Sequence, residues 1–191
     1  TGQNGRPAYH LGMLGYGVDN LNADDVISQD LDSLNLGLAG YFTVSDDATT
    51  KVTPLLTSND AAAGIPTYKI QPRMNPASLQ SGFQPTGETY PLAVRIAGPA
   101  KSAFGEEAPA TAATGQDHIA EGEVQVVAIA DTDLLSDQFW VRVNNFLGQM
   151  IASPFASNGD LLVNAVDNLL GSADVISIKS RAGYNRPFTL V

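Results

Sequence analysis

The stretch EVQVVAIAD at residues 123–131 decides the fold class. It is a nearly continuous apolar run, which is typical of a strand buried on both faces of a parallel sheet. The segment 134–150 that follows predicts a helix, because its large apolar residues recur every three or four positions and form one stripe. The members of that stripe are Leu135, Phe139, Val143, Phe146 and Met150.

A second helix is predicted from Asn158 through GDLLVNAVDNLLG, with Gly171 where a C-cap glycine belongs. Its expected buried face consists of Leu162, Val166, Leu169 and Leu170. DVISIKS at 174–180 reads as a last strand. Strand, helix, helix, strand predicts an α/β fold, a layered sheet with helices on both faces.

The rest of the chain predicts further strands joined by irregular segments. A short strand, weakened by its glycines, is predicted at 10–16. Period-two alternation predicts strands within SLNLGLAGYFTV (33–44), through Leu34, Leu36 and Leu38, and at YPLAVRIAG (90–98). KVTPLLTS (51–58) is another strand, which Pro54 assigns to a sheet edge. Residues 22–32 predict an acidic turn or short helix, 75–83 a helical turn, and 105–118 a mobile loop.

Length and composition exclude several classes of protein. With 191 residues, the chain is expected to form a single domain, 1–191. The absence of Cys excludes disulfides, cysteine-ligated metals and a thiol nucleophile. A net charge of −10 argues against nucleic-acid binding, in which neutralised phosphates supply much of the affinity.

The ends of the sequence suggest an excised piece of a longer protein. It opens TGQNGRPAYH, without an initiator Met or a basic region followed by an apolar one, so no signal peptide is evident. The longest apolar stretch, VVAIA at 126–130, is far short of a membrane span. We therefore expect any membrane anchor to lie outside this sequence.

Asp131, Thr132 and Asp133 form the sharpest polar group. They follow the strongest predicted strand, at the end where open α/β sheets bind ligands. The favoured reading is that one carboxylate caps the next helix; the alternatives are contact with a ligand or with Mg²⁺. Ser136 and Asn158, at predicted helix N-termini, complete the rim of any pocket.

The other candidate residues give weaker indications of a functional site. His10 and His118 have no metal-ligand spacing, and no Gly-x-Ser-x-Gly elbow is present, so no catalytic residue, metal or cofactor is predicted. Phe139 and Trp140 are expected in the core rather than on a sugar or a partner. Arg181 and Arg186, in a tail without acids, are the positions expected to meet an acidic partner.

The C-terminal third resembles a known family. ADTDLLSDQFWV, ASPFASNGDLLVNAVDNLLGSADVISIKSR and RPFTLV are similar to the GldG-like auxiliary components of ABC-type transporters associated with gliding motility. DDVISQDLDSLNLGLAGYF, TPLLTS and AVRIAGPAKSAF also fit, so the resemblance runs from about residue 20 to the end. It implies a domain like the class I glutamine-amidotransferase fold, present in part. The Cys nucleophile of that fold's enzymes is absent from this chain.

The resemblance also implies a location and a role. Members are anchored in the bacterial inner membrane and expose a large extracytoplasmic region, so the implied compartment is the periplasm. The expected function is a non-catalytic auxiliary or binding component of an ABC-type transport system. Its partners would be a permease or another membrane subunit, or a ligand such as a carbohydrate. The alternatives are a metal-dependent hydrolase using Asp131 and Asp133, and a structural module that forms homo-oligomers through an edge strand.

Overall fold

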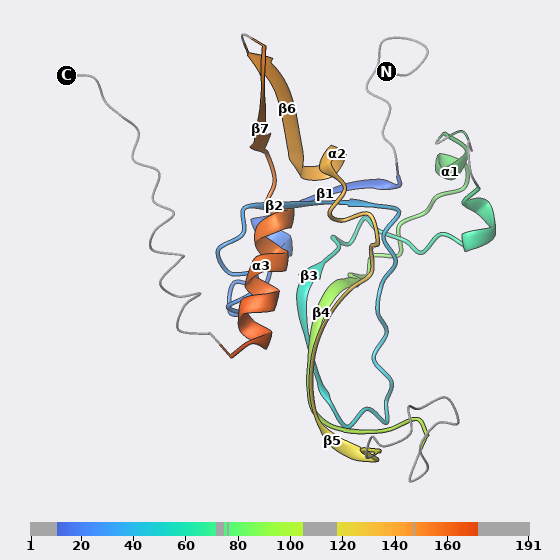
Figure 1. Cartoon of the computed structure of the whole chain (residues 1–191). Helices are drawn as coiled ribbons and strands as arrows, with labels where there is room; N and C mark the ends of the chain where they lie inside the picture. The colour runs from blue at the N-terminus through green and yellow to red at the C-terminus, as the bar shows by residue number, and fades with distance from the viewer. Residues whose placement is uncertain (1–10, 72–74, 76, 105–117, 147, 172–191) are drawn as a thin grey trace.

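The computed structural model describes residues 11–71, 75, 77–104, 118–146 and 148–171 (Figure 1). Within these ranges the chain is mixed α/β, as predicted, with three separate antiparallel sheets. The strands are β1 (Met13–Gly17), β2 (Ser33–Gly37), β3 (Lys51–Thr57), β4 (Pro91–Lys101), β5 (Glu121–Ile129), β6 (Val141–Phe146) and β7 (Gln149–Pro154). The helices are α1 (Ala77–Gln80), α2 (Asp137–Trp140) and α3 (Asn158–Leu169), with 3-10 turns η1 (Val18–Asn20) and η2 (Thr67–Lys69).

The first sheet pairs β1 with β2. The predicted alternation in β2 is confirmed, because Leu34 and Leu36 are fully buried on the same face of the strand. Leu38 does not continue this face. Its φ of 53° turns the backbone out of the strand, and its side chain is exposed. Residues 22–32 connect the two strands through turns rather than a helix.

The second sheet has the order β3-β4-β5, so β3 lies at an edge, as Pro54 predicted. The Ala130 N–H donates to the Leu92 carbonyl at 2.9 Å, so Leu92 directs its polar groups toward β5. Because backbone groups alternate in direction along a strand, Val94, two residues further on, also directs its N–H and C=O toward β5. Pro54 pairs with Val94 on the other side, and its nitrogen faces the outer edge of the sheet, where no ladder donor is needed.

The interpretation of 123–131 as a doubly buried parallel strand is wrong. β5 runs antiparallel to β4 and lies at the sheet's edge. Val127 and Ile129 pack against the core, whereas Val126, on the opposite face, is exposed. An unbroken apolar run is also compatible with a strand that has one buried and one exposed face, and it does not show how many strands flank it.

The helix predicted over 134–150 is also wrong. Helix α2 covers four residues only, and the chain then forms the hairpin β6–β7, with Gly148 at a φ of +84° in the turn. β-branched Val141 and Val143 alternate with Arg142 and favour a strand. This local period of two outweighs the wider spacing of three and four residues.

Helix α3 begins at Asn158 as predicted, and Gly171, at a φ of +79°, follows its C-terminus. Its predicted buried face is wrong: Leu162, Val166, Leu169 and Leu170 are all exposed. The residues that α3 buries are Asn158, Leu161 and Ala165. The rotation of the helix is set by Asn158, whose side chain is hydrogen-bonded inside the protein.

One main core unites these parts. It lies where β1–β2, the 22–32 segment and the start of α3 meet the upper part of the β3–β4–β5 sheet (Figure 1). A salt bridge also ties the 22–32 segment to β4: Arg95 Nη2 lies 2.5 Å from Asp25 Oδ2. The Asp25 side chain is 1% exposed and that of Arg95 35%. No helix in the described ranges is long and apolar enough to cross a membrane.

Candidate interaction site

Two of the residues predicted to line a pocket, Asp131 and Asn158, bond to the free edge of β2 and seal it. Asp131 follows β5, and its Oδ2 accepts the Gly37 N–H at 2.7 Å. Its Oδ1 accepts the Asp133 N–H, also at 2.7 Å, which closes a tight turn. Both carboxylate oxygens are therefore bonded to backbone groups. The prediction that Asp131 or Asp133 caps the next helix is wrong, since neither bonds to the first turn of α2.

Asn158 continues this seal along the same strand. Its Oδ1 accepts the Asn35 N–H at 3.1 Å, and its Nδ2 donates to the carbonyls of Asn35 at 2.7 Å and Leu134 at 2.8 Å. The amide thus imitates a neighbouring strand by pairing with both backbone groups of Asn35. Ser157 extends the pattern, because its N–H donates to the Ser33 carbonyl at 2.8 Å.

The remaining predicted residues lie apart from this seal. Thr132 and Asp133 are exposed in the turn after β5, and Ser136 precedes α2 without a side-chain capping bond. Arg181 and Arg186 lie outside the described residues, as does the strand predicted at 174–180. The loop predicted at 105–118 also lies outside them, except for His118. Within the described ranges, no group of three or more His, Cys, Asp or Glu residues could hold a metal.

A shallow groove that the sequence did not indicate lies at the far end of the β4–β5 pair. Its volume is about 400 Å³, and its walls mix one cation with two carboxylates. The residues lining it are Thr49, Pro99, Ala100, Lys101, Glu121, Gly122 and Glu123. The residues of β4 and β5 meet here because the two strands pair, and Thr49 joins them through the hydrogen bond that its hydroxyl donates to the Pro99 carbonyl at 2.6 Å.

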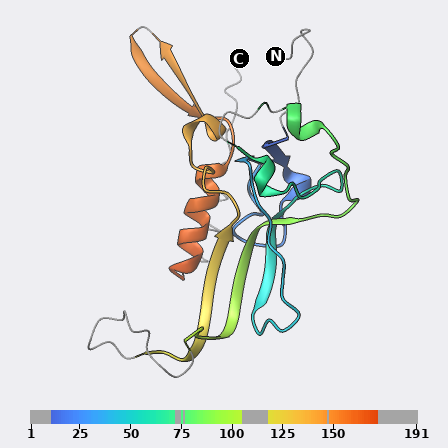
Figure 2. The same cartoon turned by 90° about the vertical axis from the view of Figure 1, so that its right-hand side faces the viewer.

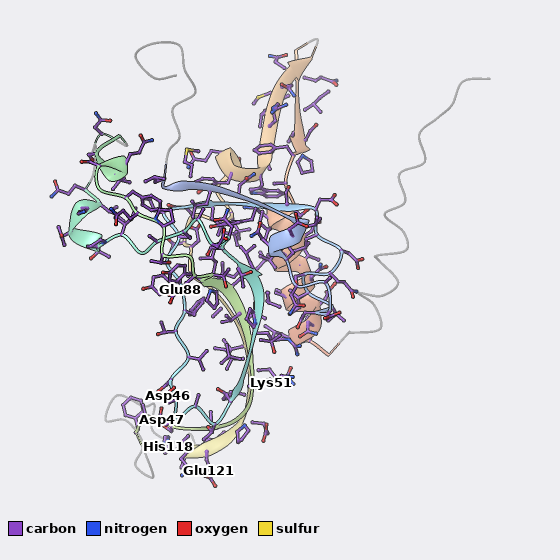
Figure 3. The ribbon with its side chains drawn as sticks, turned by 180° about the vertical axis from the view of Figure 1, so that it is seen from behind. Asp46, Asp47, Lys51, Glu88, His118 and Glu121 are labelled. Carbon is purple, nitrogen blue, oxygen red and sulfur yellow. The ribbon has the colours of Figure 1, made fainter. Side chains whose placement is uncertain are left out.

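Charged side chains gather around this end of the sheet, where Figure 3 places Asp46, Asp47, His118 and Glu121. The Ser45 hydroxyl donates to Asp47 Oδ1, and this hydrogen bond lowers the pKa of Asp47. Asp47 is an exposed turn residue, so its carboxylate is solvated. The negative charge at this end is carried by Asp46, Asp47 and Glu121, whose side chains are all exposed.

The hairpin β6–β7 is the most distinctive exposed feature. It projects from the body beyond α2 (Figure 2), and β6 and β7 pack mainly on each other. Every residue of β7 is exposed, and Met150 is 77% exposed. Val143 and Ile151 add further exposed apolar surface on the hairpin.

The base of the hairpin is held firmly. The Phe155 N–H donates to the Trp140 carbonyl at 2.8 Å, and the Arg142 guanidinium lies 5.6 Å from the centre of the Phe155 ring. The Trp140 indole N–H donates to the Leu135 carbonyl at 3.2 Å. Its ring lies against Gly159 at the start of α3, so closely that a Cβ at this position would lie 2.7 Å from Trp140 Cζ3. A rigid base therefore carries an exposed apolar arm.

The comparisons with known proteins address the whole chain. A family model described as an ABC-type uncharacterized transport system matches residues 1–165. The chain belongs to this family of transport-system auxiliary proteins. No curated protein and no solved structure gave a significant match.

Membership in the ABC transport auxiliary family agrees with the kind of site the structure offers. The family assigns the protein to an ABC-type transport system as an auxiliary component. In this auxiliary protein, the side chains of Asp131 and Asn158 bind backbone groups of the chain itself, whereas apolar side chains on the hairpin face outward.

Proposed function

We propose that this auxiliary protein is a non-catalytic binding component that contacts a membrane subunit of its transport system through the β6–β7 hairpin. The observation that carries the proposal is the projecting hairpin with exposed Val143, Met150 and Ile151. Val143 and Met150 share one face of the hairpin and Ile151 lies on the other, because side chains alternate along each strand. Exposed apolar side chains gathered on one projecting element commonly mark a protein contact.

The energetics of small hairpins support this role. A two-stranded hairpin alone is at best marginally stable in water. In this protein, β6 and β7 gain little from the body beyond the contacts around Trp140 and Phe155. A partner that covered Val143 and Met150, which share a face, would bury their apolar surface, at about 25 cal/mol per Å².

Location is part of the same proposal. The resemblance to GldG-like proteins suggests the periplasmic face of the inner membrane, with the anchor outside this chain. A projecting apolar arm on a domain held near the membrane would be suited to meet a permease or its accessory subunit. Because affinity at protein interfaces is concentrated in a few large side chains, Met150 is the residue on which we centre the test.

The test is site-specific photocrosslinking in the native host. A photoreactive amino acid replaces Met150 in the full-length protein, and a matched variant carries it at Tyr68, which is also strongly exposed but lies on η2 away from the hairpin. We expect a crosslink from position 150 to a permease or other subunit of an ABC transporter, identified by mass spectrometry, and none from position 68.

A second variant checks that the contact is apolar. Met150→Asp combined with Ile151→Asp should abolish co-purification with that subunit while leaving the melting temperature of the purified domain nearly unchanged, because both side chains are exposed. Equal crosslinking from the two positions, or co-purification that survives the double substitution, would overturn the proposal.

A further inference from the structure

The outer edge of β5 is open in the described part of the chain. The Ala130 N–H points to Leu92, so the alternation of the ladder turns the backbone groups of Glu123, Gln125, Val127 and Ile129 away from β4. No hydrogen bond to these groups is present among the described residues. Open edges of this kind are usually covered or paired in natural sheets.

Beside this edge, α3 leaves an apolar flank uncovered. Leu162, Val166 and Leu169 lie on adjacent turns of the helix, and all three are exposed. The opposite flank of α3 faces the 22–32 segment, because Asn164 Nδ2 donates to the Ile27 carbonyl at 3.1 Å. The uncovered flank therefore points away from that segment. Helix α3 contacts β5 and lies on the β5 side of the sheet in Figure 2.

We infer that residues 174–180 of this same chain occupy the slot formed by the β5 edge and the α3 flank. In this arrangement the segment adds to β5 as a fourth strand of the β3–β4–β5 sheet. Its sequence, DVISIKS, alternates in the way that such a place requires. Ile176 and Ile178 share one face and would meet the apolar flank of α3, while Ser177 and Lys179 share the other.

The direction of α3 fits a parallel pairing. The helix begins beside the end of β5, where Asn158 donates to the Leu134 carbonyl, and it runs back along the sheet (Figure 1). A strand that follows Gly171 would then run in the same direction as β5. Parallel neighbours require a crossover connection that usually contains a helix, and α3 would be that helix.

The closeness of the segment favours it over a second copy or another protein. Only two residues separate Gly171 from the predicted strand, so the segment is held at high effective concentration beside the edge. Occupation of the slot by residues 174–180 also explains why α3 turns a second apolar side away from the core. A helix with one side on the core and an adjacent side under an added strand needs apolar residues on both sides, which is the pattern observed.

The test is amide hydrogen exchange followed by NMR on the full 191-residue chain. We expect the outward-facing amides of Gln125 and Val127 to be protected, and the variant Ser177→Pro to accelerate their exchange by about tenfold or more, because proline cannot join the ladder. Ala182→Pro, beyond the segment, is the matched control and should leave the rates unchanged.

The amides of Val124 and Val126 face β4 and report whether each variant still folds. Protection at Val124 with rapid exchange at Gln125 in the unmodified chain would overturn the inference. So would rates at Gln125 that Ser177→Pro does not change. Protection that disappears on dilution would also overturn it, since it would assign the edge to a second copy of the chain.

Discussion

Asn158 shows how a single side chain can set the position of a helix. Its amide bonds three backbone groups on two different segments and is fully buried. The substitution Asn158→Ala would leave the N–H and C=O of Asn35 without these partners, and each unsatisfied buried group costs about 1–3 kcal/mol. We therefore expect a loss of about 2–4 kcal/mol in the free energy of unfolding.

Urea denaturation would measure this loss. Asn164→Ala is the matched control, because Asn164 lies on the same helix but donates a single hydrogen bond, to the Ile27 carbonyl. Its expected cost is about 1 kcal/mol. Similar losses for the two variants would contradict the role assigned to the Asn158 amide.

Tyr16 gives the protein a sensitivity to alkaline pH. Burial raises the pKa of Tyr16 above its ordinary value of 10.0, because the charged phenolate is poorly solvated in the core. Above pH 10 the unfolded chain loses this proton more readily than the folded one. The stabilisation is therefore complete below the unfolded pKa and is lost as the pH rises through the folded pKa.

Tyr16→Phe keeps the buried ring and removes the ionisable group. We expect the variant to lose less stability than the unmodified protein between about pH 9 and pH 11, as measured by chemical denaturation at each pH. Parallel curves for the two proteins over that range would show that other groups cause the alkaline loss.

At the scale of elements, α2 and β2 fit together through a glycine. A Cβ at Gly37 would collide with the ring of Phe139, a buried residue of α2. We expect Gly37→Ala to destabilise the fold by about 1–3 kcal/mol, because a packed ring must shift. Gly17→Ala, in the partner strand β1, meets nothing within 4 Å and should change the melting temperature far less.

The sequence predicted elements best where their pattern was local. The alternation of Leu34 and Leu36 and the position of Pro54 each reflect one strand's own contacts, and both predictions are confirmed. The long helix failed because the apolar spacing from Leu135 to Met150 matched a helical period across a turn at Gly148. Periodicity over a long window cannot reveal such a turn.

The candidate site was harder to predict because its residues act at long range. Asp131 was singled out correctly as a polar residue at a strand end, yet its partner, Gly37, is 94 positions away. No pattern in the sequence around Asp131 indicates that its carboxylate accepts a hydrogen bond from the backbone of β2. The exposed hairpin that carries Met150 and Ile151 was not predicted, because a helix was predicted over the same residues. The alternation of Val141 and Val143 with Arg142 was a signal for a strand there.

Across the whole molecule, charge opposes compactness. The chain carries 20 acidic and 10 basic residues, for a net charge of −10, and the excess carboxylates repel one another in the folded state. Added salt shortens the screening length from about 30 Å at 0.01 M to about 8 Å at 0.15 M. We therefore expect the free energy of unfolding to rise with NaCl over this range, by a gain on the order of 1 kcal/mol.

A charge-reduced variant separates this effect from general salt effects. Asp46→Asn with Asp60→Asn removes two negative charges at exposed positions. The variant should be at least as stable as the unmodified protein at low salt and should gain less from added NaCl, as followed by urea denaturation at each salt concentration. If stability instead fell with salt, attractive pairs such as Asp25–Arg95 would outweigh the repulsion. That pair is partly shielded from solvent, so salt should screen it less than it screens the surface carboxylates.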